Sequence, residues 1–98
     1  MRVCVVLAVV AAVAAWAEAG VTVKEADGNV RVEIDGSLFT EYHYNHVARP
    51  FLYPVIGPQG EPMTRNWPMI KTTNETMDHV HHKGLWFAHG NVNGVDFW

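Results

Sequence analysis

The stretch VTVKEADGNVRVEIDGSLFTEYHY, residues 21–44, decides the fold class. Residues 21–25 and 30–34 alternate apolar and polar side chains, which is the two-residue period of a strand with one face toward water. An Asp-Gly turn signal follows each of these two runs, and residues 37–44 form a third strand-like run rich in Phe, Thr and Tyr. We therefore expect three antiparallel strands joined as a meander.

The rest of the chain continues this pattern and shows no convincing amphipathic helix. Residues 49–58 are extended but contain prolines, which places them at a sheet edge or in a strand broken by bulges. Asn93-Gly94 predicts a hairpin turn between residues 87–92 and 95–98. The chain stops on that apolar second arm, so we expect an N-terminal fragment. The predicted fold class is all-β, of the antiparallel β-sandwich type, incomplete because the chain is a fragment.

The first residues have the composition of a secretory signal. Arg2 precedes an apolar run at residues 3–15, and either Ala15-Trp16-Ala17 or Ala17-Glu18-Ala19 offers a small-x-small cleavage pattern. The run is too short for a membrane span, although an uncleaved anchor is the alternative. We expect a signal peptide at residues 1–19 and a β domain at 20–98, in a secreted or periplasmic protein with no membrane span in the mature chain.

Charge and cysteine content narrow the class of partner. The net charge is −3, and the seven cationic residues are spread singly. No basic cluster follows a phosphate backbone, so nucleic acid is not an expected partner. The one cysteine lies in the signal segment, which leaves the exported part without a disulfide or a thiolate metal ligand. A small-molecule or carbohydrate ligand fits this composition.

Four of the six histidines lie in the stretch DHVHHKGLWFAHG, residues 78–90. In an extended conformation, His79 and His81 share one face, and two imidazoles so spaced can bind one metal ion. A cupin site would need a glutamate about four residues later, but Leu85 and Trp86 stand there. The candidate metal ligands are His79 and His81, and the ions that suit such ligands are copper, iron and zinc. Four residues are candidates for the third ligand: His43, Glu75, Asp78 and His89.

A second interpretation needs no metal. Histidines near neutral pKa beside a carboxylate transfer protons, tryptophans stack on sugar rings, and arginines grip carboxylates or hydroxyls. The candidate catalytic residues are His79, His81, His82, His89 and Asp78. The candidate substrate-binding residues are Arg49, Arg65, Trp67, Trp86, Asn93 and Asp96. This set indicates a carbohydrate-active enzyme or a non-catalytic glycan-binding module. In the alternative without a functional site, the histidines and tryptophans stabilise the loops by hydrogen bonds to the backbone.

Three blocks of the sequence carry a family resemblance. They are RPFLYP at residues 49–54 with Gly57-Pro58, TRNWP at residues 64–68, and residues 78–98. Together they resemble the bacterial methane oxygenase PmoA family over residues 49–98, with Val80 where the pattern has proline. The resemblance implies an exported β-sandwich protein, longer than this chain, whose label implies a metal-dependent methane oxygenase. We expect the 98-residue chain alone to be inactive, because its sheet cannot close.

Overall fold

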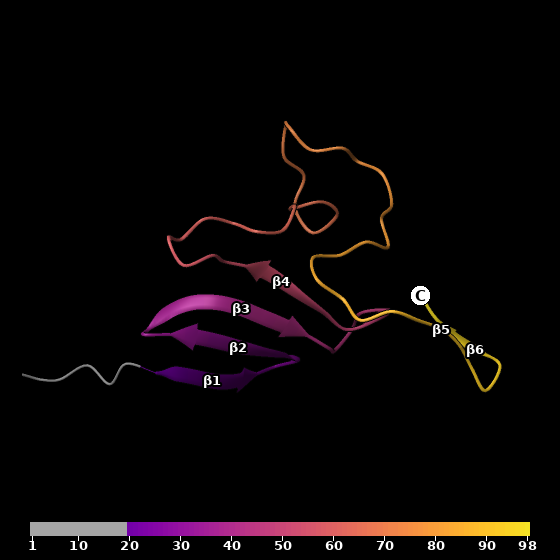
Figure 1. The fold of residues 1–98 in the computed structure, drawn as a ribbon, viewed down its shortest axis with the longest axis horizontal. Helices are drawn as coiled ribbons and strands as arrows, with labels where there is room; N and C mark the ends of the chain where they lie inside the picture. The colour runs from indigo at the N-terminus through magenta and orange to yellow at the C-terminus, as the bar shows by residue number, and fades with distance from the viewer. Residues whose placement is uncertain (1–19) are drawn as a thin grey trace, which may run out of the picture.

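An antiparallel meander forms the main sheet of the computed structural model, which describes residues 20–98 (Figure 1). The expected signal peptide, residues 1–19, lies outside the described residues. The sheet has the order β1-β2-β3-β4 and the hairpin β5-β6 forms a second, two-stranded sheet. The strand bounds are β1 Val21–Ala26, β2 Asn29–Ile34, β3 Ser37–His43, β4 Phe51–Val55, β5 His89–Val92 and β6 Val95–Phe97.

The three tight turns lie where the sequence predicts them. Each joins two antiparallel strands through a two-residue loop in which both residues have positive φ, as a type I′ turn requires. Asp and Asn tolerate this conformation better than other residues with a Cβ, and Gly adopts it freely. The turn residues are Asp27-Gly28, Asp35-Gly36 and Asn93-Gly94.

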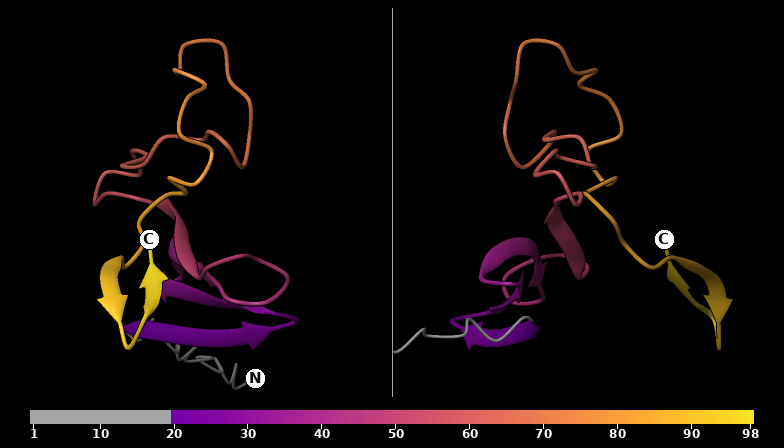
Figure 2. Two further views of the ribbon diagram at one scale, coloured as in Figure 1. Left: turned by 90° about the vertical axis from the view of Figure 1, so that its right-hand side faces the viewer. Right: turned by 60° about the vertical axis from the view of Figure 1, so that its left-hand side comes forward.

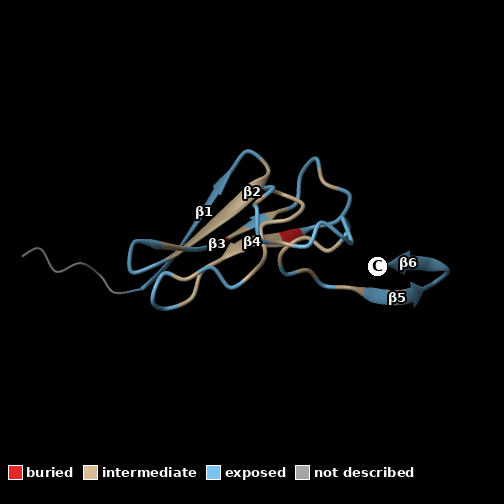
Figure 3. Cartoon of the chain, turned by 90° about the horizontal axis from the view of Figure 1, so that it is seen from above, coloured by how far each residue is buried: buried red, intermediate tan, exposed pale blue. Residues whose placement is uncertain are grey.

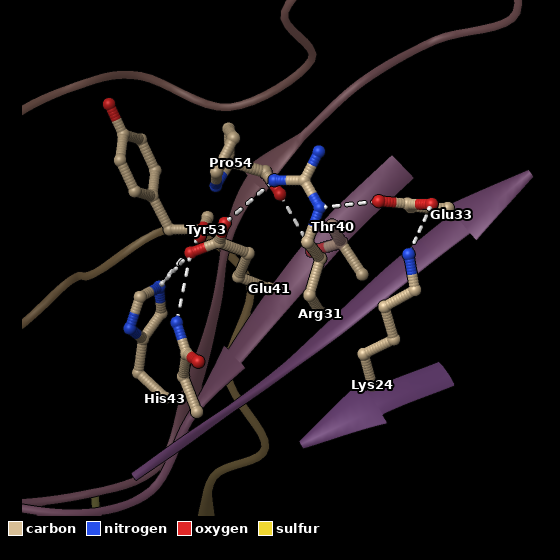
Figure 4. Close-up of polar contacts among 9 residues, drawn as sticks. Lys24, Arg31, Glu33, Thr40, Glu41, His43, Tyr53 and Pro54 are labelled. Carbon is tan, nitrogen blue, oxygen red and sulfur yellow. Dashed lines mark hydrogen bonds and ion pairs between the residues drawn. The ribbon is translucent and has the colours of Figure 1, made fainter. Parts of the chain in front are cut away.

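Strand β4 forms the edge of the main sheet, as its proline predicts. Pro54 has no N–H to give to a ladder, and its carbonyl oxygen accepts a 2.6 Å hydrogen bond from the Thr40 hydroxyl of β3 (Figure 4). The β3–β4 register shifts between Thr40 and Tyr42, which marks a bulge. On its far side, Leu52 exchanges two backbone hydrogen bonds, of 2.7 and 2.9 Å, with Leu85. That pairing brings a distant segment of the chain to the sheet edge.

One face of β2 and β3 carries a network of ion pairs (Figure 4). The guanidinium of Arg31 lies 2.7 Å from a Glu33 oxygen and 3.2 Å from a Glu41 oxygen. The His43 Nε2 lies 3.9 Å from Glu41 and 2.8 Å from the carbonyl oxygen of Tyr53. Glu41 and His43 lie two residues apart on β3 and therefore share one face of the strand. In the structure both side chains are bonded within the sheet.

Few side chains are buried among the described residues (Figure 3). Phe51 is the only buried apolar residue of residues 20–98, with 6% of its surface exposed, and Thr40 is the only buried polar one. The hairpin β5-β6 extends from one end of the main sheet instead of covering it (Figures 1 and 2). The described residues form no helix, so the all-β, antiparallel class is confirmed.

Residues 56–88 connect β4 to the hairpin without a regular strand or helix of their own. The segment leaves the sheet edge and returns to β4 at Leu85 (Figure 1). It contains His79, His81 and His82. Across residues 20–98 the structure has no helix of the length and apolarity that a membrane crossing requires.

Candidate functional site

Three imidazole rings meet on the segment between β4 and β5. His79, His81 and His82, called the histidine cluster below, each offer one ring nitrogen, and these nitrogens lie within 4.8 Å of one another. The rings of His79 and His82 stack with centroids 4.7 Å apart, and the His81 ring meets that of His82 edge-on at 4.2 Å. This is the densest group of metal-ligating side chains in the described part of the chain.

A turn brings the three rings together, not a strand. His79 has a φ of 41°, and its carbonyl oxygen accepts a 2.9 Å hydrogen bond from the backbone N–H of His82. The extended conformation expected for this segment is therefore wrong. In a strand His82 would point away from His79 and His81, whereas the turn places all three on one side. The third histidine of the cluster is His82. None of the four residues that the sequence offered as a third ligand belongs to the cluster.

Arg65 holds the backbone at the start of the histidine cluster. Its guanidinium donates to the Asp78 carboxylate at 2.7 Å and to the backbone oxygens of Asp78 and His79 at 3.0 and 3.1 Å. The Trp67 indole N–H donates to the same Asp78 oxygen at 2.9 Å. Two residues predicted to bind substrate, Arg65 and Trp67, thus hold the cluster's own backbone.

Glu75 closes the same segment into a loop. Its carboxylate accepts hydrogen bonds from the backbone N–H groups of Asn66 and Trp67, the shortest at 2.8 Å. The side-chain oxygen of Asn66 accepts a 2.6 Å bond from the Tyr53 hydroxyl of β4. These contacts connect β4 to the polar loop and, through Arg65, to the histidine cluster.

Gly84 lets the chain return close to β4. A Cβ built at Gly84 would lie 2.1 Å from the backbone oxygen of Leu52, and the φ of Gly84 is +52°. Only glycine meets both conditions without displacing the backbone. The return places the Trp86 ring against His82, with centroids 4.8 Å apart and an interplanar angle of 23°. The aromatic ring thereby covers one face of the histidine cluster.

The electrostatics of the site favour neutral imidazole and ionised carboxylate. Burial lowers the pKa of His82, and the neighbouring His81 and His79 lower it further. The Arg65 hydrogen bond lowers the pKa of Asp78. The second carboxylate oxygen of Asp78 lies 3.7 Å from Nε2 of His79, so it can orient that ring.

Two hollows are lined by Trp86, whose ring covers His82. The smaller, called the small cavity, has a volume of about 200 Å³ and is lined by Arg49, Phe51, His81, Lys83 and Trp86 among others. The larger, called the aromatic groove, has a volume of about 780 Å³ and runs toward the hairpin; its lining includes Tyr42, Trp86, Phe87, His89 and Phe97. Four residues line both hollows: Arg49, Pro50, Phe51 and Trp86.

The hairpin residues predicted as site members lie apart from the histidine cluster. His89 lines the aromatic groove and its Nδ1 is 2.9 Å from the Gly90 carbonyl oxygen. Asn93 occupies the β5-β6 turn, and the Asp96 carboxylate accepts a 3.1 Å bond from the Trp98 N–H. Sequence reasoning missed Phe51, which lies beneath Lys83 with the ammonium nitrogen 5.5 Å from its ring centroid. No local pattern signals that contact.

The histidine cluster fits a metal ion after a small adjustment. Two imidazole nitrogens at 2.0–2.1 Å from one ion are at most about 4.2 Å apart, and about 3.4 Å apart in a tetrahedron. The nitrogens of the cluster lie within 4.8 Å of one another, so ring rotations that move them by about 1 Å suffice. The exposed faces of His79 and His81 leave room for such rotations.

No curated protein and no solved structure matches the chain. A model described as a family of unknown function, DUF6807, matches residues 29–98, which include β2 to β6 and the whole histidine stretch. The resemblance to the methane oxygenase PmoA family is therefore wrong, because the model that matches these residues is that of a different family, one of unknown function. The match spans more than two thirds of the sequence, and the chain belongs to the DUF6807 family of unknown function.

Proposed function

We propose that the chain binds one divalent transition-metal ion, zinc in the first place, through His79, His81 and His82, and uses it to polarise a ligand oxygen. The observation that carries the proposal is the meeting of three imidazole nitrogens within 4.8 Å on a turn held from outside by Arg65. Three imidazoles leave a fourth zinc position open, and zinc there acts as a Lewis acid toward a bound oxygen.

The three imidazole nitrogens determine which metal ions the site suits. Zinc, copper and iron all accept imidazole nitrogen, whereas magnesium and calcium prefer oxygen ligands. Zinc has no geometric preference of its own, so it suits three nitrogens that come from a short turn. Lowered pKa values keep His82 neutral and Asp78 ionised near pH 7, which is the protonation state that binding needs.

The residues around the cluster have distinct roles in this proposal. Asp78 is a positioning residue, because one of its oxygens is held by Arg65 and the other approaches the ring of His79. Trp86 covers the ring of His82 and limits access of water from that side. Arg65 holds the backbone of Asp78 and His79.

Zinc content after equilibrium dialysis tests the proposal. The full chain should retain one equivalent of zinc, and His82→Ala should weaken binding by at least about a hundredfold, since each ligand supplies a share of the binding energy. His46→Ala is the matched control, because His46 lies in the loop after β3, outside the cluster. Less than about a tenth of an equivalent in the wild type, or equal retention by His82→Ala, would overturn the proposal.

A second candidate function is glycan binding without metal. The aromatic groove, with a volume of about 780 Å³, presents Tyr42, Trp86 and Phe87, and such rings stack on the apolar faces of sugars. A glycan screen on metal-free protein tests it: binding that Trp86→Ala removes, and that Trp98→Ala outside the groove lining leaves intact, favours this function. Absence of any glycan ligand would eliminate it.

The proposed site belongs to an exported protein. The support is the sequence of residues 1–19, with one arginine before an apolar run and a small-x-small pattern at its end. Zinc and copper sites built from imidazole need no reducing compartment, so export is compatible with the histidine cluster. N-terminal sequencing of the protein recovered from the periplasm or medium checks this: a mature start at residue 18 or 20 agrees, and an intact Met1 contradicts it.

A further inference from the structure

Two cationic side chains border the small cavity beside the histidine cluster. Arg49 follows β3 in an exposed loop, and Lys83 directly follows His82. Both line the cavity of about 200 Å³, together with His81. We propose that Arg49 and Lys83 form an oxyanion subsite next to the metal position, and that its ligand is a small carboxylate carrying a ring or other flat apolar body. This inference deepens the proposed function and in part rests on it.

The charges of these two residues are uncompensated within the described chain. Among residues 20–98, the ion pairs of the structure involve Lys24, Arg31, Arg65 and two histidines, but neither Arg49 nor Lys83. Lys83 instead lies over the Phe51 ring, with its ammonium nitrogen 5.5 Å from the centroid. That contact fixes the lysine at the cavity wall and leaves its hydrogen-bond donors available.

A metal ion in the histidine cluster would increase the local positive charge. Imidazole is a neutral ligand, so three of them leave the ion's two charges intact. The one carboxylate adjoining the cluster, Asp78, is already neutralised by Arg65 at 2.7 Å. The ion, Arg49 and Lys83 would therefore create a positive region on a chain whose net charge is −3. Such a region selects an anionic ligand.

The walls and size of the cavity define the rest of the ligand. Phe51 and Trp86 supply aromatic walls, and Ala48, Pro50 and Val80 supply aliphatic ones. A volume of about 200 Å³ corresponds to about seven water molecules at liquid density. A carboxylate with a six-membered ring has this size. A bare phosphate would satisfy the two cations but would leave the apolar walls without a partner.

Benzoate titrations of the full chain, monitored by calorimetry with and without zinc, test the subsite. Benzoate should bind the wild type, and Arg49→Gln and Lys83→Gln should each weaken it about ten- to a hundredfold, as expected for loss of a charge-assisted hydrogen bond. Arg49→Lys should retain most of the affinity. Lys71→Gln is the matched control, since Lys71 is an exposed loop cation outside the cavity lining. Circular dichroism verifies that each variant folds as the wild type does.

The arms of the experiment separate the two proposals. Benzoate affinity that depends on Arg49 and Lys83 in both metal-free and zinc-treated protein supports the subsite, even if zinc itself is not retained. Zinc retained with a benzoate affinity that neither variant changes overturns the subsite and leaves the metal site standing. Inorganic phosphate and benzyl alcohol identify the chemistry: tighter binding of either than of benzoate contradicts a ring-bearing carboxylate.

Discussion

The guanidinium group of Arg65 donates a hydrogen bond of 2.7 Å to the carboxylate of Asp78, the residue directly before the histidine cluster. The same guanidinium reaches the backbone oxygens of Asp78 and His79. One side chain therefore fixes both the position and the backbone direction of the turn that gathers His79, His81 and His82. The geometry of the cluster depends on a residue that contacts no imidazole nitrogen.

Arg65→Lys should weaken zinc binding about ten- to a hundredfold, which is the usual effect of losing a group that positions metal ligands. Lysine keeps the charge but lacks the planar fork that spans Asp78 and His79. Competition with a chromogenic chelator measures the affinity. Arg31→Lys is the control, because Arg31 makes similar carboxylate contacts within the sheet. Equal zinc affinities of Arg65→Lys and the wild type would contradict the positioning role.

The loop closed by Glu75 should loosen at acidic pH. Hydrogen bonds from the backbone N–H groups, that of Asn66 first, lower the pKa of Glu75 below its ordinary value of 4.5. A carboxylate whose pKa is lower in the folded chain stabilises the fold above the unfolded value. That contribution is lost as the pH falls through 4.5 toward the folded-state pKa. NMR titration of the Asn66 and Trp67 amide signals measures it; a midpoint at or above 4.5 disagrees with the structure.

Gly84→Ala should displace the segment that returns to β4. Its Cβ would lie 2.1 Å from the Leu52 backbone oxygen, so the Leu52–Leu85 pairing and the stacking of Trp86 on His82 would both be disturbed. Gly36→Ala is a matched control, because Gly36 also has positive φ, +79°, but nothing lies within 4 Å of its Cβ position. Near-ultraviolet circular dichroism should change for Gly84→Ala alone. The same change in both variants would indicate backbone strain, not the close approach.

Phe51→Ala should reduce the free energy of unfolding by about 3 kcal/mol. The substitution loses the free energy of burying the ring and leaves a cavity, and both effects destabilise the fold. Phe51 is 6% exposed and its ring stacks on His43 at 4.9 Å. Phe87→Ala is the control, because that side chain is 86% exposed. Urea denaturation compares the two. Similar losses for both variants would mean that Phe51 does not lie at the centre of the packing.

The turns and the sheet edge could be predicted because each depends on neighbouring residues. Asp-Gly and Asn-Gly dipeptides adopt the positive φ values that a two-residue hairpin loop needs. Pro54 cannot donate to a ladder, which restricts its strand to an edge. These are local properties of the backbone, and the observed strands agree with them.

The histidine cluster could be predicted only as a composition, not as a geometry. The period of a strand separates His82 from His79 and His81, and the cluster forms because His79 adopts a positive φ of 41°. Histidine is enriched among residues with positive φ, but that tendency does not predict which histidine of the stretch adopts it. Its cause is distant in sequence: Arg65 binds the backbone at Asp78 and His79 across the connecting loop. Non-local contacts of this kind leave no periodic signal.

X-ray absorption at the zinc edge tests the central claim most directly. The full chain loaded with one equivalent of zinc should show three imidazole nitrogens at about 2.0–2.1 Å and one oxygen ligand. In His82→Ala the number of imidazole ligands should fall to two, while His89→Ala, outside the cluster, should keep three. A wild-type spectrum with one imidazole or none, or a spectrum that His82→Ala leaves unchanged, would contradict the proposed metal site.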